Sequence, residues 1–295
     1  MRIAFIGFGE AARAFVASLR STPDLTFAAY DVLLGSGRDS EGALRDAAGE
    51  MGVALADSPA AAIESAEWII SAVTATDSLE AGRSVASFLT TGQTFIDINS
   101  VSAGRKRETA QSVCAGGAAY VDMAVMAPVH PRGHRAPVLL AGPDCETLEA
   151  RFSRLGFAYS IVGDEIGAAT SIKMLRSLFV KGMEAVTVQT LLAAKAAGRF
   201  DEVYASLSES FPQLDWPKYP KYQIERVSRH GVRRAAEMRE SAATQKELGF
   251  DAGHKLADAI ADVQEQIGRL GFVPDTDADV ADQYSSLLGA FRNKA

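Results

Sequence analysis

Short apolar runs alternate with segments of helical spacing along the first half of the chain. The runs are almost entirely apolar, which is typical of strands that are covered by helices on both faces of a sheet. Strands alternating with helices need crossover connections, so the pattern predicts an α/β fold with a mostly parallel sheet. The runs are RIAFI, TFAAYD, WIISAV, TFIDI, YVDMAV and PVLLAG, and the helical segments between most of them are Glu10–Arg20, Glu41–Met51, Ser78–Leu89 and Arg105–Cys114.

The strand pattern stops after about Gly163, and the rest of the chain is helical in pattern. One long helix is expected over Glu165–Gly198, followed by helices at Asp201–Ser208, Ile224–Leu248 and Ala252–Leu270. The long helix is apolar on more than one face, which favours a homodimer formed through the helical region. The sequence therefore predicts two domains, a doubly wound sheet over 1–163 and an all-helical domain over 164–295, joined by the long helix.

Composition and charge narrow the class of protein. The 295 residues carry a formal net charge of −7, which argues against binding to nucleic acid phosphates. No uncharged run of about 18 residues is present, so no membrane span is expected. Two cysteines, Cys114 and Cys145, fit a reducing compartment. Met1 leads almost directly into a strand without a signal-peptide pattern, and we expect a cytoplasmic protein.

A glycine turn follows the first strand. Gly7, Phe8, Gly9, Glu10, Ala11 and Ala12 fit the pattern G-x-G-x-x-A between a strand and a helix. Glycines there permit the tight turn and the approach of a pyrophosphate to the backbone, as in the Rossmann fold. Asp31 follows Gly9 by 22 residues and suits the hydroxyls of an adenosine ribose, so NAD(P) is expected and NAD is favoured. Arg38 is close enough in sequence to bind a 2′-phosphate instead, and a purely structural turn is the alternative.

Polar residues follow two later strands of the expected sheet. Thr74 comes directly after Val73, the last residue of WIISAV, and Asn99 and Ser100 come after TFIDI. Ligands of open α/β sheets bind beyond the carboxyl ends of the strands. We expect Val73, Thr74 and Asn99 to contact the cofactor and Ser100 to contact the substrate. Helix capping alone would also explain such residues.

Lys173 stands within an apolar stretch of the long helix. Its spacing fits either a side chain that extends to the surface or a lysine held in a cleft for acid/base catalysis. The chain resembles the β-hydroxyacid dehydrogenase superfamily, in the glycine turn and in the arrangement of Gly163, Gly167 and Lys173. That superfamily includes 3-hydroxyisobutyrate dehydrogenase, tartronate semialdehyde reductase and 6-phosphogluconate dehydrogenase. The resemblance implies that Lys173 is the catalytic acid/base of hydride transfer at a nicotinamide.

The chain departs from the superfamily at its substrate motifs. Ser177 stands where the family has asparagine, and Met126 stands where it has a serine that holds the substrate carboxylate. The segment VHPRGHRAP also replaces a glycine-rich run, and its Pro131 and Gly133 argue against a helical His-x-x-x-His metal site. The chain resembles a divergent branch that is phosphogluconate-dehydrogenase-like, and no metal is expected.

Further substrate contacts are expected on the helices. His230, Arg234 and Glu237 share one helical face, where an arginine suits a carboxylate, although a salt-bridged surface is the alternative. Arg176 lies about one turn after Lys173 and is a candidate for the missing contacts to an acidic group. The candidate substrate residues are Ser100, Met126, Arg176, Ser177, His230 and Arg234.

The sequence thus predicts an NAD(P)-dependent enzyme that interconverts a β-hydroxy acid, or a similar small acidic alcohol, and its oxo form. Two alternatives stay open: an oxidative decarboxylase of the 6-phosphogluconate type and a non-catalytic dinucleotide-binding sensor. An imine reductase would share the architecture, but those enzymes generally lack the lysine.

Overall fold

The computed structural model describes residues 1–293. The chain divides into two compact units, Met1–Lys173 and Met174–Ala295, and the division falls inside the long helix rather than at residue 163. Each unit has its own hydrophobic core.

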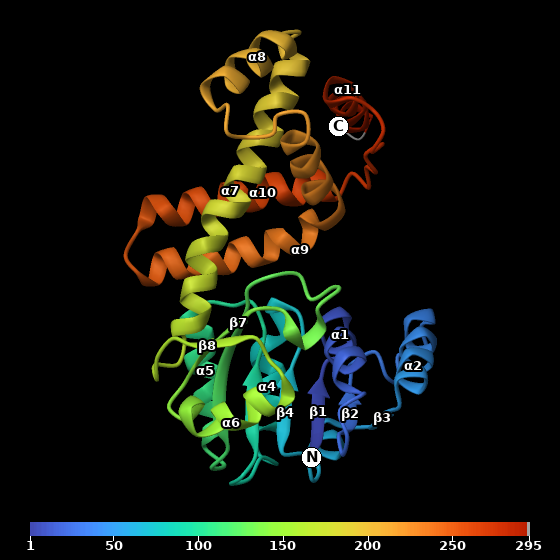
Figure 1. Cartoon of the computed structure of the whole chain (residues 1–295), viewed down its shortest axis with the longest axis vertical. Coiled ribbons are helices and arrows are strands. Elements are labelled where there is room, and N and C mark those ends of the chain that lie inside the picture. The colour runs from blue at the N-terminus through green and yellow to red at the C-terminus, as the bar shows by residue number, and fades with distance from the viewer. Residues whose placement is uncertain (294–295) are drawn as a thin grey trace. The chain divides into compact units, whose positions relative to one another are not determined.

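Within residues 1–293, eight strands form one sheet in the order β3-β2-β1-β4-β5-β6-β7-β8 (Figure 1). All neighbouring strands are parallel except β6 and β7, which are antiparallel. The mostly parallel sheet confirms the predicted α/β class. The strands are β1 (Arg2–Ile6), β2 (Thr26–Tyr30), β3 (Val53–Leu55), β4 (Trp68–Ser71), β5 (Thr94–Asp97), β6 (Ala119–Val125), β7 (Val138–Ala141) and β8 (Tyr159–Ile161).

Helices cover both faces of this sheet. Alternate residues of β1 enter different cores, because successive side chains of a strand point to opposite faces. Ile3 and Phe5 pack with α1, α2 and α6, whereas Ala4 and Ile6 pack with α3, α4 and α5. The helices are α1 (Glu10–Leu19), α2 (Asp39–Met51), α3 (Pro59–Ile63), α4 (Ser78–Ala86), α5 (Ala103–Cys114) and α6 (Cys145–Leu155). The doubly wound arrangement leaves the carboxyl ends of β1, β4 and β5 at one edge of the sheet.

The second unit is helical. Val188 and Leu191 of the long helix α7 (Ala168–Ala196) are fully buried in its core together with Tyr284. A second cluster holds Met238 and Ile260 against the same helix. The remaining helices are α8 (Phe200–Ser210), α9 (Tyr219–Glu247), α10 (Asp251–Gly268) and α11 (Val280–Arg292). Three of these agree closely with the sequence pattern, and α11 adds a helix that the pattern did not indicate.

Candidate functional site

The glycine turn has the geometry that a pyrophosphate site requires. Gly7 has φ +87°, and a Cβ atom there would lie 2.5 Å from the Ala72 carbonyl oxygen, so only glycine fits. Gly9 stands at the start of α1 without a side-chain cap, and a Cβ atom on it would meet no atom within 4 Å. The space beside this backbone is therefore open, and the free N–H groups of the helix start suit an anion.

The other residues of the glycine turn differ in exposure and in the contacts that they make within the protein. Phe8 is fully buried, and its amide and carbonyl are both used within the protein, so the expected contact from Phe8 to a cofactor is not open here. Glu10 is exposed, and Ala11 packs partly against the core. Arg13 donates from Nε to the Phe8 carbonyl at 2.9 Å, which helps to fix the turn.

Asp31 lies directly after β2 and is held by two backbone amides. Its Oδ2 accepts from Phe8 N at 2.8 Å, and its Oδ1 accepts from Leu33 N at 3.0 Å. The carboxylate is thus fixed beside the glycine turn while both oxygens keep further lone pairs for hydroxyl donors. Arg38 is exposed at the start of α2.

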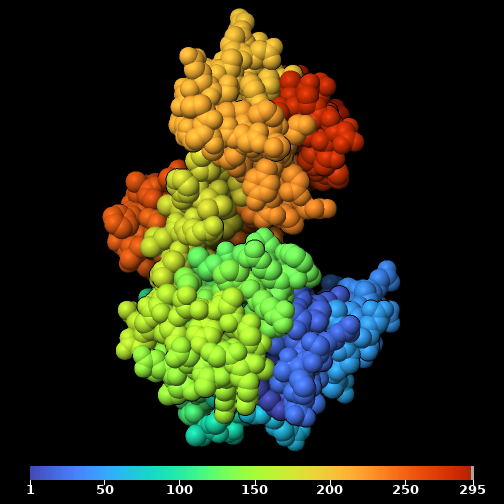
Figure 2. All heavy atoms as spheres, viewed as in Figure 1, coloured from blue at the N-terminus to red at the C-terminus, as the bar shows by residue number. Residues whose placement is uncertain are grey.

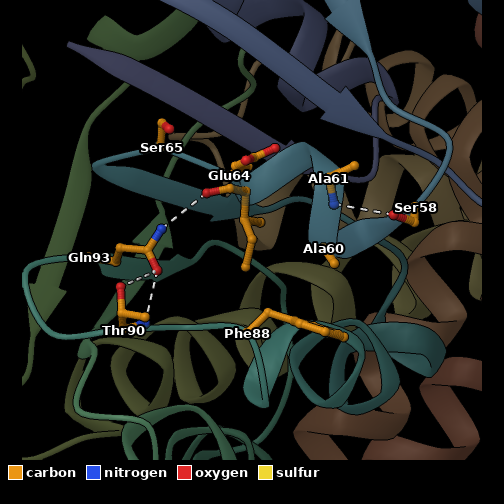
Figure 3. Close-up of a pocket in the computed structure, with 9 residues that line it drawn as sticks. Ser58, Ala60, Ala61, Glu64, Ser65, Phe88, Thr90 and Gln93 are labelled. Carbon is orange, nitrogen blue, oxygen red and sulfur yellow. Dashed lines mark hydrogen bonds between the residues drawn. The ribbon is translucent and has the colours of Figure 1, made fainter.

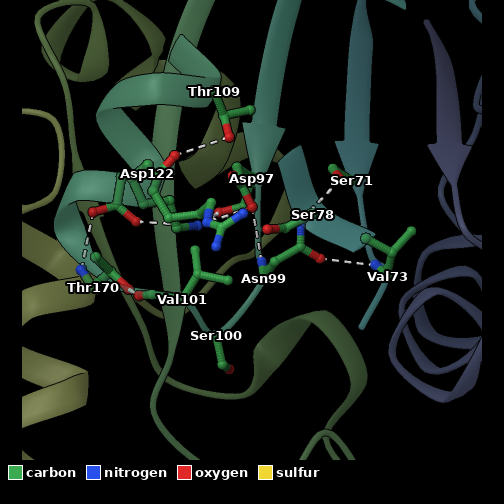
Figure 4. Close-up of polar contacts among 12 residues, drawn as sticks. Ser71, Val73, Ser78, Asp97, Asn99, Ser100, Val101, Thr109, Asp122 and Thr170 are labelled. Atoms are coloured by element: carbon green, nitrogen blue, oxygen red, sulfur yellow. Dashed lines mark hydrogen bonds and ion pairs between the residues drawn. The ribbon is translucent and has the colours of Figure 1, made fainter. Parts of the chain in front are cut away.

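Asn99 joins the loops that follow β4 and β5 (Figure 4). Its Oδ1 accepts from Val73 N at 2.8 Å, and its Nδ2 donates to Ser71 Oγ at 2.9 Å. The side chain is buried and used within the protein, so a contact from Asn99 to a cofactor would come from its backbone. Thr74 donates from Oγ1 to Asp77 Oδ2 at 2.6 Å at the exposed start of the next helix.

Lys173 and Ser100 are in direct contact. The Lys173 ammonium donates to Ser100 Oγ at 2.6 Å, although the two residues are 73 positions apart in sequence. Ser100 follows β5 and Lys173 lies in the second turn of α7, and both are partly buried. The structure thus places the lysine singled out by the sequence at the carboxyl edge of the sheet, beside a hydroxyl.

Comparisons with known proteins agree with this geometry. Residues 2–101 match a family model described as NADP oxidoreductase coenzyme F420-dependent, and residues 194–267 match a domain of unknown function, DUF1932. A conserved hypothetical protein from Sinorhizobium meliloti is 33% identical over 100% of this chain and 97% of its own, with a TM-score of 0.75. A conserved protein of unknown function, whose structure reveals similarity with 3-hydroxyacid dehydrogenases, is 27% identical over 92% of this chain and 100% of its own, with a TM-score of 0.68.

The chain belongs to the β-hydroxyacid dehydrogenase superfamily. It is therefore an oxidoreductase of the class that uses a nicotinamide dinucleotide. Two more distant structures share the fold. One is a 3-hydroxyisobutyrate dehydrogenase from Mycobacterium tuberculosis with L-serine, which is 16% identical over 97% of this chain and 98% of its own, with a TM-score of 0.70. The other is an imine reductase from Myxococcus stipitatus in complex with NADP+, which is 19% identical over 97% of this chain and 100% of its own, with a TM-score of 0.52.

The segment that departs from the superfamily motif packs against the first helix. Met126 is partly buried next to β6, and its amide donates to Pro137 O at 2.8 Å. His134 is buried, with Nδ1 2.8 Å from Ser18 Oγ of α1. Burial and the nearby Arg135 lower the pKa of His134. The blue N-terminal segment and the green segment lie side by side in Figure 2, in agreement with this contact. The structure thus places His134 in the core, against α1.

Arg234 and Ser177 are occupied within the helical unit. Arg234 forms a buried ion pair with Glu184, which also accepts from Gln264 Nε2 at 3.0 Å. Ser177 is buried and accepts from Lys181 Nζ at 3.1 Å. We therefore assign Arg234 to the packing of α7, α9 and α10 rather than to the substrate, in contrast to the sequence-based expectation.

The other two candidates of this unit are more accessible. His230 is half-buried, and burial together with Arg226 and Arg233 lowers its pKa. Arg176 is exposed on α7. That His230 and Arg176 contact the substrate stays a prediction.

A pocket is lined by residues that include Ser58, Glu64, Phe88 and Gln93 (Figure 3). It has a volume of about 520 Å³ and is formed by α3, the end of α4 and the turn before β5. Its Ser65 and Gln93 precede β4 and β5, whereas Ser100 follows β5. The pocket therefore belongs to the amino edge of the sheet, opposite the candidate site.

Sequence reasoning missed a buried charge beneath the site. Lys106 is fully buried, and its Nζ lies 2.9 Å from Asp97 Oδ1 and 3.4 Å from Asp122 Oδ1. Thr170 at the start of α7 contacts the same group, because its amide donates to Asp122 Oδ2 at 2.9 Å. Within residues 1–293, no group of three or more metal-ligating side chains is assembled, and no helix is long and apolar enough to cross a membrane.

Proposed function

We propose that this protein interconverts a β-hydroxy acid, or a similar small acidic alcohol, and its oxo form, with Lys173 as the general acid/base and NAD as the favoured cofactor. The contact of Lys173 Nζ with Ser100 Oγ at 2.6 Å is the observation that carries the proposal. It sets a titratable amine and a hydroxyl together at the carboxyl edge, where doubly wound folds bind their ligands.

The first unit supplies the residues that would hold the dinucleotide. The backbone of Gly9 and the start of α1 suit the pyrophosphate, because the space beside Gly9 is open, and Gly7 permits the tight turn that precedes it. Asp31 suits the ribose hydroxyls, and its charge disfavours a 2′-phosphate. When bound, the nicotinamide supplies the hydride acceptor for oxidation or the hydride donor for reduction.

Lys173 would move the proton that accompanies the hydride. In oxidation its neutral amine takes the proton of the substrate hydroxyl, and in reduction its ammonium returns a proton to the carbonyl oxygen. Ser100 is within hydrogen-bonding distance of Nζ and orients the amine, and its hydroxyl is also available to the substrate. A positioned acid/base of this kind contributes about 10²–10⁴ in rate.

The decisive experiment is turnover across a panel of β-hydroxy acids and their oxo forms, for wild type and Lys173→Met, with NAD(H) and NADP(H). We expect kcat to fall by about 10²–10⁴ in the variant while the Kd for NADH stays the same. Activity that survives in Lys173→Met would assign the proton to another group. Release of carbon dioxide during oxidation would instead identify the decarboxylating alternative.

A second experiment tests the acidic substrate. Arg176→Ala should raise KM for the best acid on the panel by at least about tenfold and leave the Kd for NADH unchanged, because a lost charge-assisted hydrogen bond costs about 1.5–3 kcal/mol. Lys246→Ala, which removes an exposed charge of α9, is the matched control. An unchanged KM in Arg176→Ala removes this residue from the substrate site.

We also propose a homodimer through the helical unit. Phe179 and Val186 of α7 have exposed fractions of 72% and 61%, and Ile172, Leu175 and Met183 extend the same stripe at helical spacing. Such a stripe of large apolar side chains is typical of an interface. Phe179→Glu should convert the dimer to a monomer in light scattering, whereas Phe88→Glu, at an exposed phenylalanine of the first unit, should leave the dimer unchanged.

A further inference from the structure

The start of α7, which belongs to the first unit, contacts the sheet and the loop after β5 at three points. The Thr170 amide donates to Asp122 Oδ2 at 2.9 Å, and Thr170 Oγ1 donates to Val101 O at 2.6 Å. The third point is the contact of Lys173 with Ser100 at 2.6 Å. Thr170 and Lys173 are three residues apart and share a helical face, and Ser100 and Val101 are neighbours in one loop. The two side chains therefore form parallel links between the same helix and the same loop.

Asp122, which contacts Thr170 in Figure 4, is itself fixed by the buried ammonium group of Lys106. Lys106 Nζ donates to Asp97 O at 2.6 Å and lies between the Asp97 and Asp122 carboxylates. Tyr120 completes the group, because its hydroxyl donates to Asp97 Oδ2 at 2.7 Å. Burial, with a contribution from Asp97, raises the pKa of Asp122 even though Lys106 and the Thr170 amide act in the opposite direction.

The desolvation cost of these buried charges indicates that the group does more than stabilise the fold. Two carboxylates and one ammonium are removed from water, and the desolvation of buried charges cancels much of their attraction. Apolar residues of similar volume would hold β5, β6 and α5 together at least as well. What only the polar group provides is directional contact: Asp122 orients an amide one helical turn before Lys173.

We propose that Asp97, Lys106, Asp122 and Thr170 form a positioning network that sets the Lys173 amine against Ser100. The inference rests on the proposed role of Lys173, and it adds residues that act through Lys173 without touching the substrate. Thr170 is the decisive member, because it contacts both the network and the loop of Ser100. A misplacement of about 1 Å at a reacting group can cost about 10²-fold in rate.

Thr170→Val and Thr170→Ser test the network. Valine has nearly the shape of threonine, so it removes the hydrogen bond to Val101 and keeps the amide bond to Asp122, whereas serine keeps both. Two readouts are compared: kcat and KM on the best substrate, and the rate at which sulfo-NHS-acetate acetylates Lys173, measured by mass spectrometry relative to exposed Lys246. The labelling readout needs neither substrate nor cofactor.

We expect Thr170→Val to lower kcat by about 10- to 100-fold with little change in KM or in the Kd for NADH. Lys173 should be acetylated several-fold faster, because its amine is no longer held against Ser100. Thr170→Ser should restore both values to near wild type. Asp122→Asn, which keeps an acceptor for the Thr170 amide but loses the charge, should give an intermediate increase in labelling.

Equal labelling of Lys173 in wild type and Thr170→Val overturns the positioning network, whatever the activity. Failure of the proposed function has a different signature: Lys173→Met keeps its activity. In that case a faster labelling of Lys173 in Thr170→Val still supports the positioning, and equal labelling still refutes it.

Discussion

The backbone amide of Phe8 donates to Oδ2 of Asp31 over 2.8 Å, so the glycine turn and the acid after β2 form one structural unit. Both ends of an adenosine diphosphate would be recognised by groups that are already fixed relative to each other. Rigid recognition of this kind costs little conformational entropy on binding.

Cofactor preference should depend on the charge of Asp31. In Asp31→Asn, an amide oxygen still accepts from Phe8 N, but the negative charge that repels a 2′-phosphate is lost. We expect the preference for NADH over NADPH, measured as a ratio of Kd values by fluorescence titration, to fall by about tenfold, or about 1.4 kcal/mol. Arg38→Ala is the companion variant. If Arg38→Ala weakens the binding of NADPH but not of NADH, Arg38 contacts the 2′-phosphate. If the ratio of the two Kd values is unchanged in Asp31→Asn, another residue discriminates between the two cofactors.

The two glycines of the turn should respond differently to alanine. Gly9→Ala adds a methyl group to open space at φ −82°. We therefore expect its free energy of unfolding to lie within about 1 kcal/mol of the wild-type value. The same methyl group occupies the expected pyrophosphate position, and the Kd for NADH should rise by at least about tenfold. Gly7→Ala should instead destabilise the protein by about 1–3 kcal/mol or more, because its φ is +87° and its Cβ meets Ala72. Full NADH affinity in Gly9→Ala would falsify the pyrophosphate assignment.

Arg234 should contribute to the stability of the helical unit rather than to substrate binding. Arg234→Met leaves Glu184 charged and buried without its partner, which should lower the free energy of unfolding by about 3–5 kcal/mol. Arg229→Met, at an exposed pair with Glu225 on the same helix, should cost less than about 1 kcal/mol. Urea unfolding measures both. A stable Arg234→Met protein with a raised KM for substrate would restore the expectation drawn from the sequence.

His134 should make stability fall in mild acid. Burial lowers its pKa in the folded protein below the ordinary value of 6.5, so the unfolded chain takes up a proton first as the pH falls. The free energy of unfolding should therefore decrease below about pH 6.5, and less steeply in His134→Asn. Exposed His130 of the same loop provides the matched control, His130→Asn. Identical pH profiles for wild type and His134→Asn would exclude this residue as the source.

The sequence predicted the features that depend on local pattern. Apolar runs of four or more residues and the glycine spacing identified the doubly wound sheet and the turn at Gly7 and Gly9. The three-residue strands β3 and β8 were too short to show a pattern. Lys106 lies between Arg105 and Arg107 in a polar helix, and nothing local distinguishes a fully buried lysine there from its neighbours. Its partners Asp97 and Asp122 come from the strands β5 and β6, so only the tertiary fold reveals the group.

The same limit applies to His134 and Arg234. Arg234 looked like a substrate contact because basic residues lie beside it in sequence, and nothing beside His134 in sequence indicated that it is buried. His134 contacts Ser18, which is 116 residues away, and Arg234 contacts Glu184, which is 50 residues away. Lys173 was identified through a family motif, and its contact with Ser100 could not be deduced from spacing.

The position of β1 has a consequence for biosynthesis. This strand is made before both of its neighbours in the sheet, since it lies between β2 and β4, and β4 begins only at Trp68. At about 5–20 residues per second, the ribosome needs about 2–8 s to pass from the end of β2 to the start of β4. During that interval the apolar segment RIAFI has an unpaired edge, which is a template for wrong pairing. Changes in translation speed between residues 31 and 67 should therefore alter the yield of folded protein without altering its sequence.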